Sequence, residues 1–283
     1  MSLEYSITYS AENQYENWVD EAFLQFLIIP EDNSDQELLG ITFTNTLRLP
    51  HEFSLNGLGF RTIKVHPKTR FKDIGFKAVF KVRKHSMNPF ENSSMELGQK
   101  DHDLVASLAF KVDHEPYLKI TPFTQLPVDK QDLYLFNKDL PLFQNLQDLN
   151  SWVFEHLVFK TNVTAVDTPL EEVVRLRQGV CQDFTHLFCA LSRRNHIPTR
   201  YVSGYLHQGN GYFGDSQMHA WTECFVPGMG WIGFDPTNNL LASENHIKVA
   251  HGKDYTDCPP LKGVVYSIGK NKTSHTVEVS SQQ

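Results

Sequence analysis

The stretch RLRQGVCQDFTHLFCALSRRNHIP, residues 175–198, predicts the central helix of the fold. We expect this helix to begin at Cys181, because Gly179 interrupts the preceding segment and apolar side chains then recur at helical spacing. The apolar positions are Phe184, Leu187, Phe188 and Leu191. A cysteine in a first helical turn lies beside unpaired backbone N–H groups and the positive end of the helix dipole, which favour a thiolate. Cys181 is therefore a candidate nucleophile.

Two later segments contain the partners that such a nucleophile needs. MHAWTECFV, residues 218–226, contains His219, and WIGFDP, residues 231–236, contains Asp235. A tight PGMG turn separates them, so we expect adjacent antiparallel strands that bring the carboxylate to the imidazole. In such a row the imidazole takes the thiol proton, and the carboxylate orients the ring and supports its charged form. Cys181, His219 and Asp235 are the predicted catalytic residues, and together they form the predicted catalytic row.

Each of these three residues alone also has a simpler structural explanation. Free cysteines are often buried and inert, a strand histidine is often a satisfied core residue, and Asp before Pro is common in turns. The combination is more specific, because the cysteine opens a helix and the other two lie one hairpin apart. The combination favours catalysis over coincidence.

The composition narrows the classes of partner. The chain has 283 residues, of which 40% are hydrophobic, enough for one large domain or two ordinary ones. A net charge of −7 and a pI near 6.0 argue against general affinity for nucleic acid or for an anionic membrane. Small molecules and proteins remain as partners.

Targeting signals and cysteine use indicate the compartment. The first ten residues contain no basic region followed by an apolar one, and no later run approaches the roughly 18 apolar residues of a membrane span. The four cysteines are irregularly spaced, which predicts reduced thiols rather than a disulfide framework. We expect a cytoplasmic protein with no metal and no cofactor.

The periodicity predicts two domains and an α+β fold. Residues 3–80 alternate with the period of two that is typical of strands, residues 86–103 resemble a long loop, and LVASLAF at 104–110 resembles a further strand. Near Leu140 the period changes to about 3.6, and the helices that follow precede a second run of strands. We therefore predict an antiparallel β domain in residues 1–140, followed by helices packed on an antiparallel sheet in residues 141–283.

Three further residues are weaker candidates for contact with a substrate. Trp221 shares a strand face with His219, and Tyr205 lies in the preceding strand-like segment, so both are predicted to wall the cleft. Aromatic strand residues are, however, more often core. Asp183 follows the cysteine by two positions, where a carboxylate also complements the helix dipole.

Three segments resemble the transglutaminase-like cysteine enzymes, specifically the bacterial branch with an N-terminal β domain. They are GVCQDFTHLFCALSRRNHIPTRYVSGYL, MHAWTECFVPGMGWIGFDPTNN and HIKVAHGKDYTDCPPLKGVVY, which begin at residues 179, 218 and 246. The resemblance implies a papain-like core with Cys181 as nucleophile, His219 as base and Asp235 as the residue that orients it. The calcium dependence of animal relatives is not expected, because no DxDxDG-type loop is present.

These residues together predict acyl transfer on a peptide or amide carbonyl through a thioester. Water as acceptor would give peptidase or amidase activity, whereas an amine would give transglutamination. We favour hydrolysis because water is always present and crosslinking is a specialised outcome. Loop residues 207–217 are expected to control the choice. Protein-glutamine transglutaminase, deamidase and a non-catalytic binding module are the alternatives. The expected partners are a peptide or protein substrate and a partner protein on the N-terminal domain.

Overall fold

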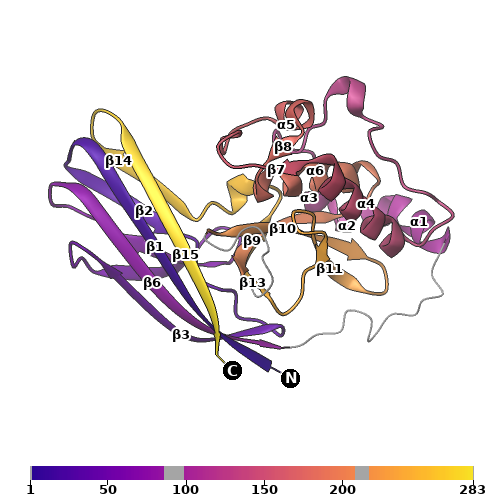
Figure 1. The fold of residues 1–283 in the computed structure, drawn as a ribbon. Helices are drawn as coiled ribbons and strands as arrows, with labels where there is room; N and C mark the ends of the chain where they lie inside the picture. Colours follow the sequence, from indigo (N-terminus) through magenta and orange to yellow (C-terminus); the bar gives the residue numbers. More distant parts are fainter. Residues whose placement is uncertain (1, 86–98, 208–216, 283) are drawn as a thin grey trace.

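Two four-stranded antiparallel sheets form the β part of the molecule, on the left of Figure 1. The computed structural model describes residues 2–85, 99–207 and 217–282. The first sheet has the order β15-β1-β6-β3 and the second the order β14-β2-β5-β4. Their strands are β1 (Ser2–Val19), β2 (Glu21–Phe26), β3 (Gln36–Asn45), β4 (His51–Leu55), β5 (Arg61–Val65), β6 (Phe71–His85), β14 (Leu261–Tyr266) and β15 (Asn271–Gln282). The predicted alternation is present, since Tyr5, Ile7 and Tyr9 of β1 are buried on one face.

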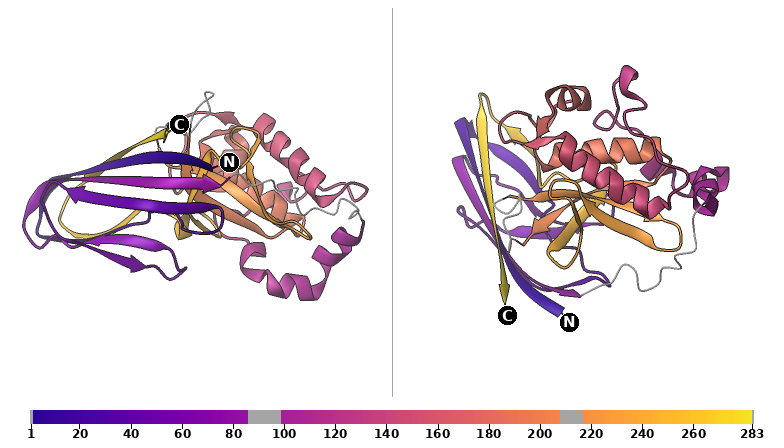
Figure 2. Two further views of the ribbon diagram at one scale, coloured as in Figure 1. Left: turned by 90° about the horizontal axis from the view of Figure 1, so that it is seen from below. Right: turned by 45° about the vertical axis from the view of Figure 1, so that its right-hand side comes forward.

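A five-stranded antiparallel sheet with helices packed on it forms the second part. Its order is β12-β11-β10-β9-β13, and its strands are β9 (Thr199–Leu206), β10 (His219–Val226), β11 (Gly230–Asp235), β12 (Leu240–Leu241) and β13 (His246–Gly252). The packed helices are α4 (Leu142–His156), α5 (Leu170–Leu176) and α6 (Cys181–Arg194). Figure 2 shows these helices gathered along one side of the sheet. The predicted α+β architecture is confirmed.

Helix α6 is the centre of this second part. It begins at Cys181, as predicted, and contacts β9, β10 and α4. Its predicted apolar face is buried, with no member more than 1% exposed: Phe184, Leu187, Phe188 and Leu191. Burial of each such side chain stabilises the fold by roughly 1.5–3 kcal/mol. This packing fixes the helix against the sheet and so fixes where its first turn lies.

The chain returns to the β part at its end, which differs from the predicted division at residue 140. Strand β15 pairs with β1 and β14 pairs with β2, so residues 261–282 extend the two N-terminal sheets. A sequence pattern shows that a segment is a strand but does not show which partner it takes. The predicted unit of residues 141–283 is therefore wrong at its C-terminal end.

Residues 99–140 also differ from the prediction, because they pack with the second part. They contain α1 (Gln99–Ala106), α2 (Leu108–Asp113), α3 (Glu115–Leu118) and the short 3-10 helix η1 (Val128–Lys130). The predicted strand at 104–110 is helical, since the Ser107 hydroxyl accepts the Phe110 N–H and begins α2. Buried side chains of this segment join the helical core: Val105, Phe110 and Leu126. Of the predicted loop, residues 86–98 lie outside the described residues.

One of the two hydrophobic clusters spans both parts of the molecule. Buried side chains of β1 and β6 pack in the same cluster as Tyr205 of β9 and Ile247 and Val249 of β13. The remaining elements are a parallel pair, β7 (Val158–Phe159) and β8 (Gln178–Gly179), and the 3-10 helix η2 (Tyr255–Asp257). No helix within the described ranges is long and apolar enough to cross a bilayer.

Candidate active site

The start of α6 is built around the Asp183 carboxylate. Its Oδ2 accepts the Val180 N–H at 2.7 Å and the Thr164 hydroxyl at 2.7 Å, while the Asp183 N–H donates to the Val180 carbonyl at 2.9 Å. Gly179 is needed beside it, because a Cβ there would lie 2.5 Å from the same oxygen. These contacts fix the turn that carries Cys181.

Asp183 is engaged at the helix start, and its contact with a substrate stays a prediction. Its side chain is buried, and its carboxylate oxygen is engaged by the residues that close the helix start. Burial raises the pKa of this carboxyl, and the hydrogen bonds from Thr164 and Val180 oppose that rise. Its role is to position the first turn, which is the structural alternative that the sequence also allowed.

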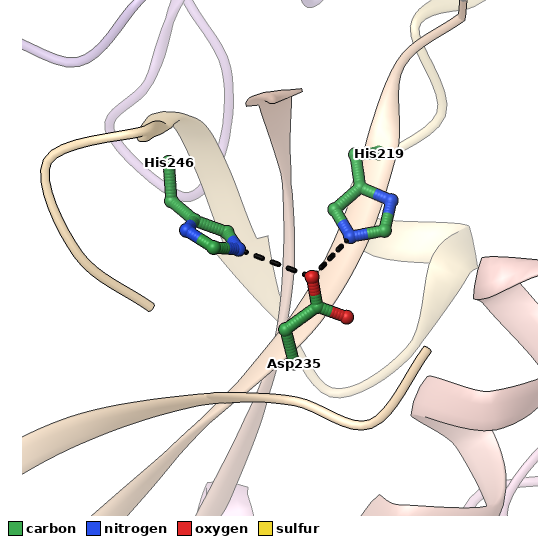
Figure 3. Close-up of side chains that lie close together, drawn as sticks. All are labelled: His219, Asp235 and His246. Atoms are coloured by element: carbon green, nitrogen blue, oxygen red, sulfur yellow. Dashed lines mark hydrogen bonds and ion pairs between the residues drawn. The ribbon is translucent and has the colours of Figure 1, made fainter. Parts of the chain in front are cut away.

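His219 and Asp235 form the predicted pair. His219 is the first residue of β10 and Asp235 the last of β11, and the hairpin register brings them together (Figure 3). The distance from His219 Nε2 to Asp235 Oδ2 is 2.8 Å, and both side chains are buried. The predicted contact is confirmed.

Asp235 is held by five hydrogen-bond donors. Its Oδ1 accepts the backbone N–H groups of Thr237 at 3.0 Å and Asn238 at 3.3 Å. Its Oδ2 accepts the Asn238 side-chain amide at 2.8 Å, as well as His219 and His246. Burial tends to raise the pKa of this carboxyl, but the two histidines outweigh burial and hold the pKa well below its usual range. Asp235 is therefore an anion at neutral pH.

The imidazole of His219 is correspondingly favoured in its charged form. Burial tends to lower its pKa, but the charge and hydrogen bond of Asp235 outweigh burial and raise it well above the usual value. The Cys181 side chain interacts with the same ring and adds to the rise. Since Nε2 is held by Asp235, Nδ1 is the nitrogen left for the sulfur, and it has no hydrogen-bond partner among the described residues.

Cys181 differs from the other three cysteines in its access to solvent. All four are free, and Cys181 is partly exposed whereas Cys189, Cys224 and Cys258 are buried. Burial raises the pKa of Cys189 to about 11 and raises the pKa of the other two buried thiols further. A partly exposed sulfur next to a protonated imidazole is the arrangement that an attacking thiolate requires.

The structure adds His246, which the sequence did not single out. It is the first residue of β13, and its Nε2 lies 3.1 Å from Asp235 Oδ2, so the carboxylate stands between two imidazoles (Figure 3). The only signal in the sequence was a histidine at the start of a strand-like segment, eleven positions after the aspartate. That spacing alone is not specific.

The same three residues carry ligand types that a metal ion prefers. One ligand atom from each of His219, Asp235 and His246 lies within 4.8 Å of the others, and imidazole with carboxylate suits zinc. An ion would have to displace the proton that Asp235 holds on His219 and the hydrogen bonds that already satisfy the carboxylate. The three residues therefore form a hydrogen-bonded network that already satisfies the carboxylate without an ion.

The two aromatic candidates have different positions. Trp221 lies against the histidines, with its ring edge-to-face to His246 at 5.2 Å and nearly parallel to His219 at 6.2 Å. Tyr205 is fully buried, and its hydroxyl donates to the Ile28 carbonyl at 2.6 Å. The prediction that Tyr205 walls the cleft is wrong, because this side chain joins the sheet to the β part. Contact of Trp221 with a substrate stays a prediction.

Comparison with known proteins agrees with this geometry. Residues 134–236, which contain all three members of the predicted row, match the family model of the transglutaminase-like superfamily. The chain carries a transglutaminase-like domain. A crystal structure described as that of a "putative cysteine protease" from Cytophaga hutchinsonii is similar over 100% of this chain and 92% of that one. Its TM-score is 0.77 at 19% identity, which shows a shared fold.

Curated proteins are similar to this chain over a shorter stretch. Uncharacterized proteins of Mycobacterium tuberculosis and Mycobacterium leprae are 36% identical over 140 and 133 residues, respectively. These matches cover 46% of this chain and 45% and 47% of the relatives. The chain thus matches about half the length of these relatives.

Proposed function

We propose that the transglutaminase-like domain is a cysteine-dependent acyl-transfer enzyme that hydrolyses peptide or amide bonds. The observation that carries the proposal is the buried His219–Asp235 hydrogen bond of 2.8 Å, with Cys181 acting on the same imidazole. The row supports a thiolate–imidazolium pair whose positive charge is stabilised by Asp235. The partial exposure of Cys181 favours catalysis over a non-catalytic scaffold, because a purely structural thiol does not require access to solvent.

The chemistry proceeds in two steps. The Cys181 sulfur attacks the carbonyl carbon, and the Cys181 backbone N–H at the start of α6 stabilises the negative charge on the carbonyl oxygen. His219 then gives its proton to the leaving amine as the C–N bond breaks, which leaves a thioester on Cys181. Water, deprotonated by His219, attacks the thioester and releases the free acid and the thiol.

The identity of the second nucleophile separates hydrolysis from transglutamination. Both reactions use the same thioester, and we favour water because it is present at full concentration in every solution. An amine competes only where the surrounding loops admit it and exclude water. Of the loop that was predicted to control this choice, residues 208–216 lie outside the described residues.

A peptide library tests this function directly. Wild type and Cys181→Ala are incubated with the library, with a primary amine added to half the samples, and the products are identified by mass spectrometry. Free acids formed by wild type alone, with and without the amine, support hydrolysis. Amine adducts would instead establish transglutamination. If wild type forms neither product, a non-catalytic binding module replaces both enzyme proposals.

We also propose a cytoplasmic location and a protein partner on the β part. The four cysteines are free in the structure, which is consistent with a reducing compartment. Several large apolar side chains are exposed on the second β sheet, among them Phe23, Phe53 and Leu55. Such side chains are consistent with contact to another protein.

A further inference from the structure

His246 has a contact that hydrolysis by Cys181, His219 and Asp235 does not explain. Its Nε2 lies 3.1 Å from Asp235 Oδ2, the same oxygen that His219 binds, and its ring is 3% exposed. Figure 3 shows the two rings approaching the same carboxylate oxygen from different directions. His246 therefore reaches the row only through Asp235.

The direction of this hydrogen bond is set by a backbone amide. The Ser243 N–H donates to His246 Nδ1 at 3.3 Å, so Nδ1 is an acceptor and the ring proton is on Nε2, directed at Asp235. Burial lowers the pKa of His246, which favours the neutral ring with this single tautomer. Asp235 thus receives a second, fixed imidazole donor at the oxygen that His219 also binds.

The strand that carries His246 is held by the β part. Gln36 of β3 is fully buried, and its side-chain amide donates to the Lys248 carbonyl at 2.8 Å while its carbonyl accepts the Lys248 N–H at 2.9 Å. The register of β13 on β9 shifts between Lys248 and Ala250. At this irregularity a side chain from the other part of the molecule binds the backbone, two residues from His246.

We propose that His246 is a positioning residue that holds the Asp235 carboxylate toward His219, and that Gln36 holds His246 in place from the β part. This proposal rests on the proposed function of the Cys181 row. The His246 donor binds the same carboxylate oxygen as His219 and adds to the contacts that oppose rotation about the Cβ–Cγ bond. Because the Asn238 amide also binds Asp235, loss of His246 weakens the row without abolishing it.

The test uses alkylation of Cys181 by iodoacetamide, which needs no knowledge of the substrate. His246→Leu removes the donor, whereas His246→Gln keeps an N–H group at the end of a side chain of similar reach. We expect His246→Leu to slow alkylation about tenfold, the effect of losing one hydrogen bond to a charged group, and His246→Gln to restore the rate to within about threefold.

A spectroscopic measurement separates positioning from general damage to the fold. The ring proton in the His219–Asp235 hydrogen bond gives a low-field NMR resonance, and we expect it to shift or broaden in His246→Leu and to return in His246→Gln. A role confined to packing would leave this resonance unchanged as long as the fold is retained, and this result would overturn the proposal.

The part played by Gln36 is tested by a double-mutant cycle. If Gln36 acts through His246, Gln36→Leu slows alkylation in the wild-type background but has a much smaller effect in His246→Leu. Tyr205→Phe is the matched control, since it also removes a hydrogen bond between the two parts but lies outside this chain of contacts. We expect Tyr205→Phe to leave the alkylation rate unchanged.

The outcomes distinguish this proposal from the function on which it rests. If Cys181 of wild type reacts no faster than the buried thiols, the proposed function fails first. If Cys181 reacts fast in wild type and equally fast in His246→Leu, the function stands and His246 has no positioning role. Additive effects of Gln36→Leu and His246→Leu would overturn the role of Gln36.

Discussion

At the scale of single residues, the catalytic row depends on two buried opposite charges, on Asp235 and His219, that stabilise each other. Asp235 is ionised because five donors replace the water it has lost, and His219 is protonated because Asp235 lies 2.8 Å away. Removal of one partner leaves the other charge buried and unpaired, which is the costly case. The two histidines differ because burial dominates for His246, whereas Asp235 and Cys181 dominate for His219.

Substitutions in the row should have unequal effects. His219→Ala removes the group that transfers protons and should lower kcat by about 10³-fold or more, the upper range for a general acid and base. Asp235→Asn leaves the imidazole in place and removes only its support, so we expect a smaller loss of about 10²-fold. Steady-state kinetics on any substrate found in the peptide library measure both. A greater loss in Asp235→Asn would contradict the orienting role.

The buried His186 predicts how stability changes with pH. Burial lowers its pKa to about 3, and its Nε2 accepts the Tyr255 N–H at 3.2 Å. Below the unfolded-state pKa of about 6.5 the unfolded chain binds a proton that the folded state refuses, so stability falls as the pH falls from about 6.5 toward 3, by up to about 1.4 kcal/mol per pH unit. Urea unfolding across this pH range should show that the free energy of unfolding falls less steeply with pH in His186→Gln than in wild type. An equal slope in both proteins would show that His186 does not cause the loss.

At the scale of elements, local patterns predicted those parts of the site that lie on neighbouring segments. The apolar period of α6 and Gly179 placed the helix start at Cys181, and the short turn between β10 and β11 predicted the His219–Asp235 contact. His246 was missed because β13 lies beside β9, not beside β11, and nothing local to it indicates that its side chain reaches the carboxylate.

The helix start gives a prediction for Asp183. Asp183→Ala removes the acceptor for Val180 N–H and Thr164 Oγ1, which should lower the free energy of unfolding by about 1–2 kcal/mol, as for other lost helix caps. Because the same turn carries Cys181, alkylation of this thiol should also slow. Chemical denaturation and labelling measure the two effects. Unchanged labelling would show that the turn keeps its geometry without the carboxylate.

At the scale of the whole molecule, the β part is assembled from both ends of the chain. The sequence predicted strands at both ends, but pairing between residues 235 or more positions apart has no local signature. The same limit explains Gln36, whose side chain binds Lys248 across 212 positions. The fold class was therefore predictable from the sequence, whereas the assignment of segments to each part of the molecule was not.

Removal of the C-terminal strands should destabilise both parts. Deletion of residues 261–283 takes away the partners of β1 and β2, and β1 alone loses a ladder of 12 residue pairs. Since one hydrophobic cluster spans both parts, we expect a fall in Tm of about 10 °C or more, corresponding to roughly 3 kcal/mol or more at this chain length. Calorimetry measures the change. A shift of only a degree or two would show that the β sheets fold without their last strands.

The central claim is that Cys181 is the nucleophile and that His219 activates its sulfur. Its most direct test is the alkylation rate of each cysteine at mildly acidic pH, where an ordinary thiol is unreactive, followed by peptide mass spectrometry in wild type and His219→Ala. We predict that Cys181 is modified well before Cys189, Cys224 and Cys258 in wild type and loses this lead in His219→Ala. Equally slow modification of all four thiols in wild type would contradict it.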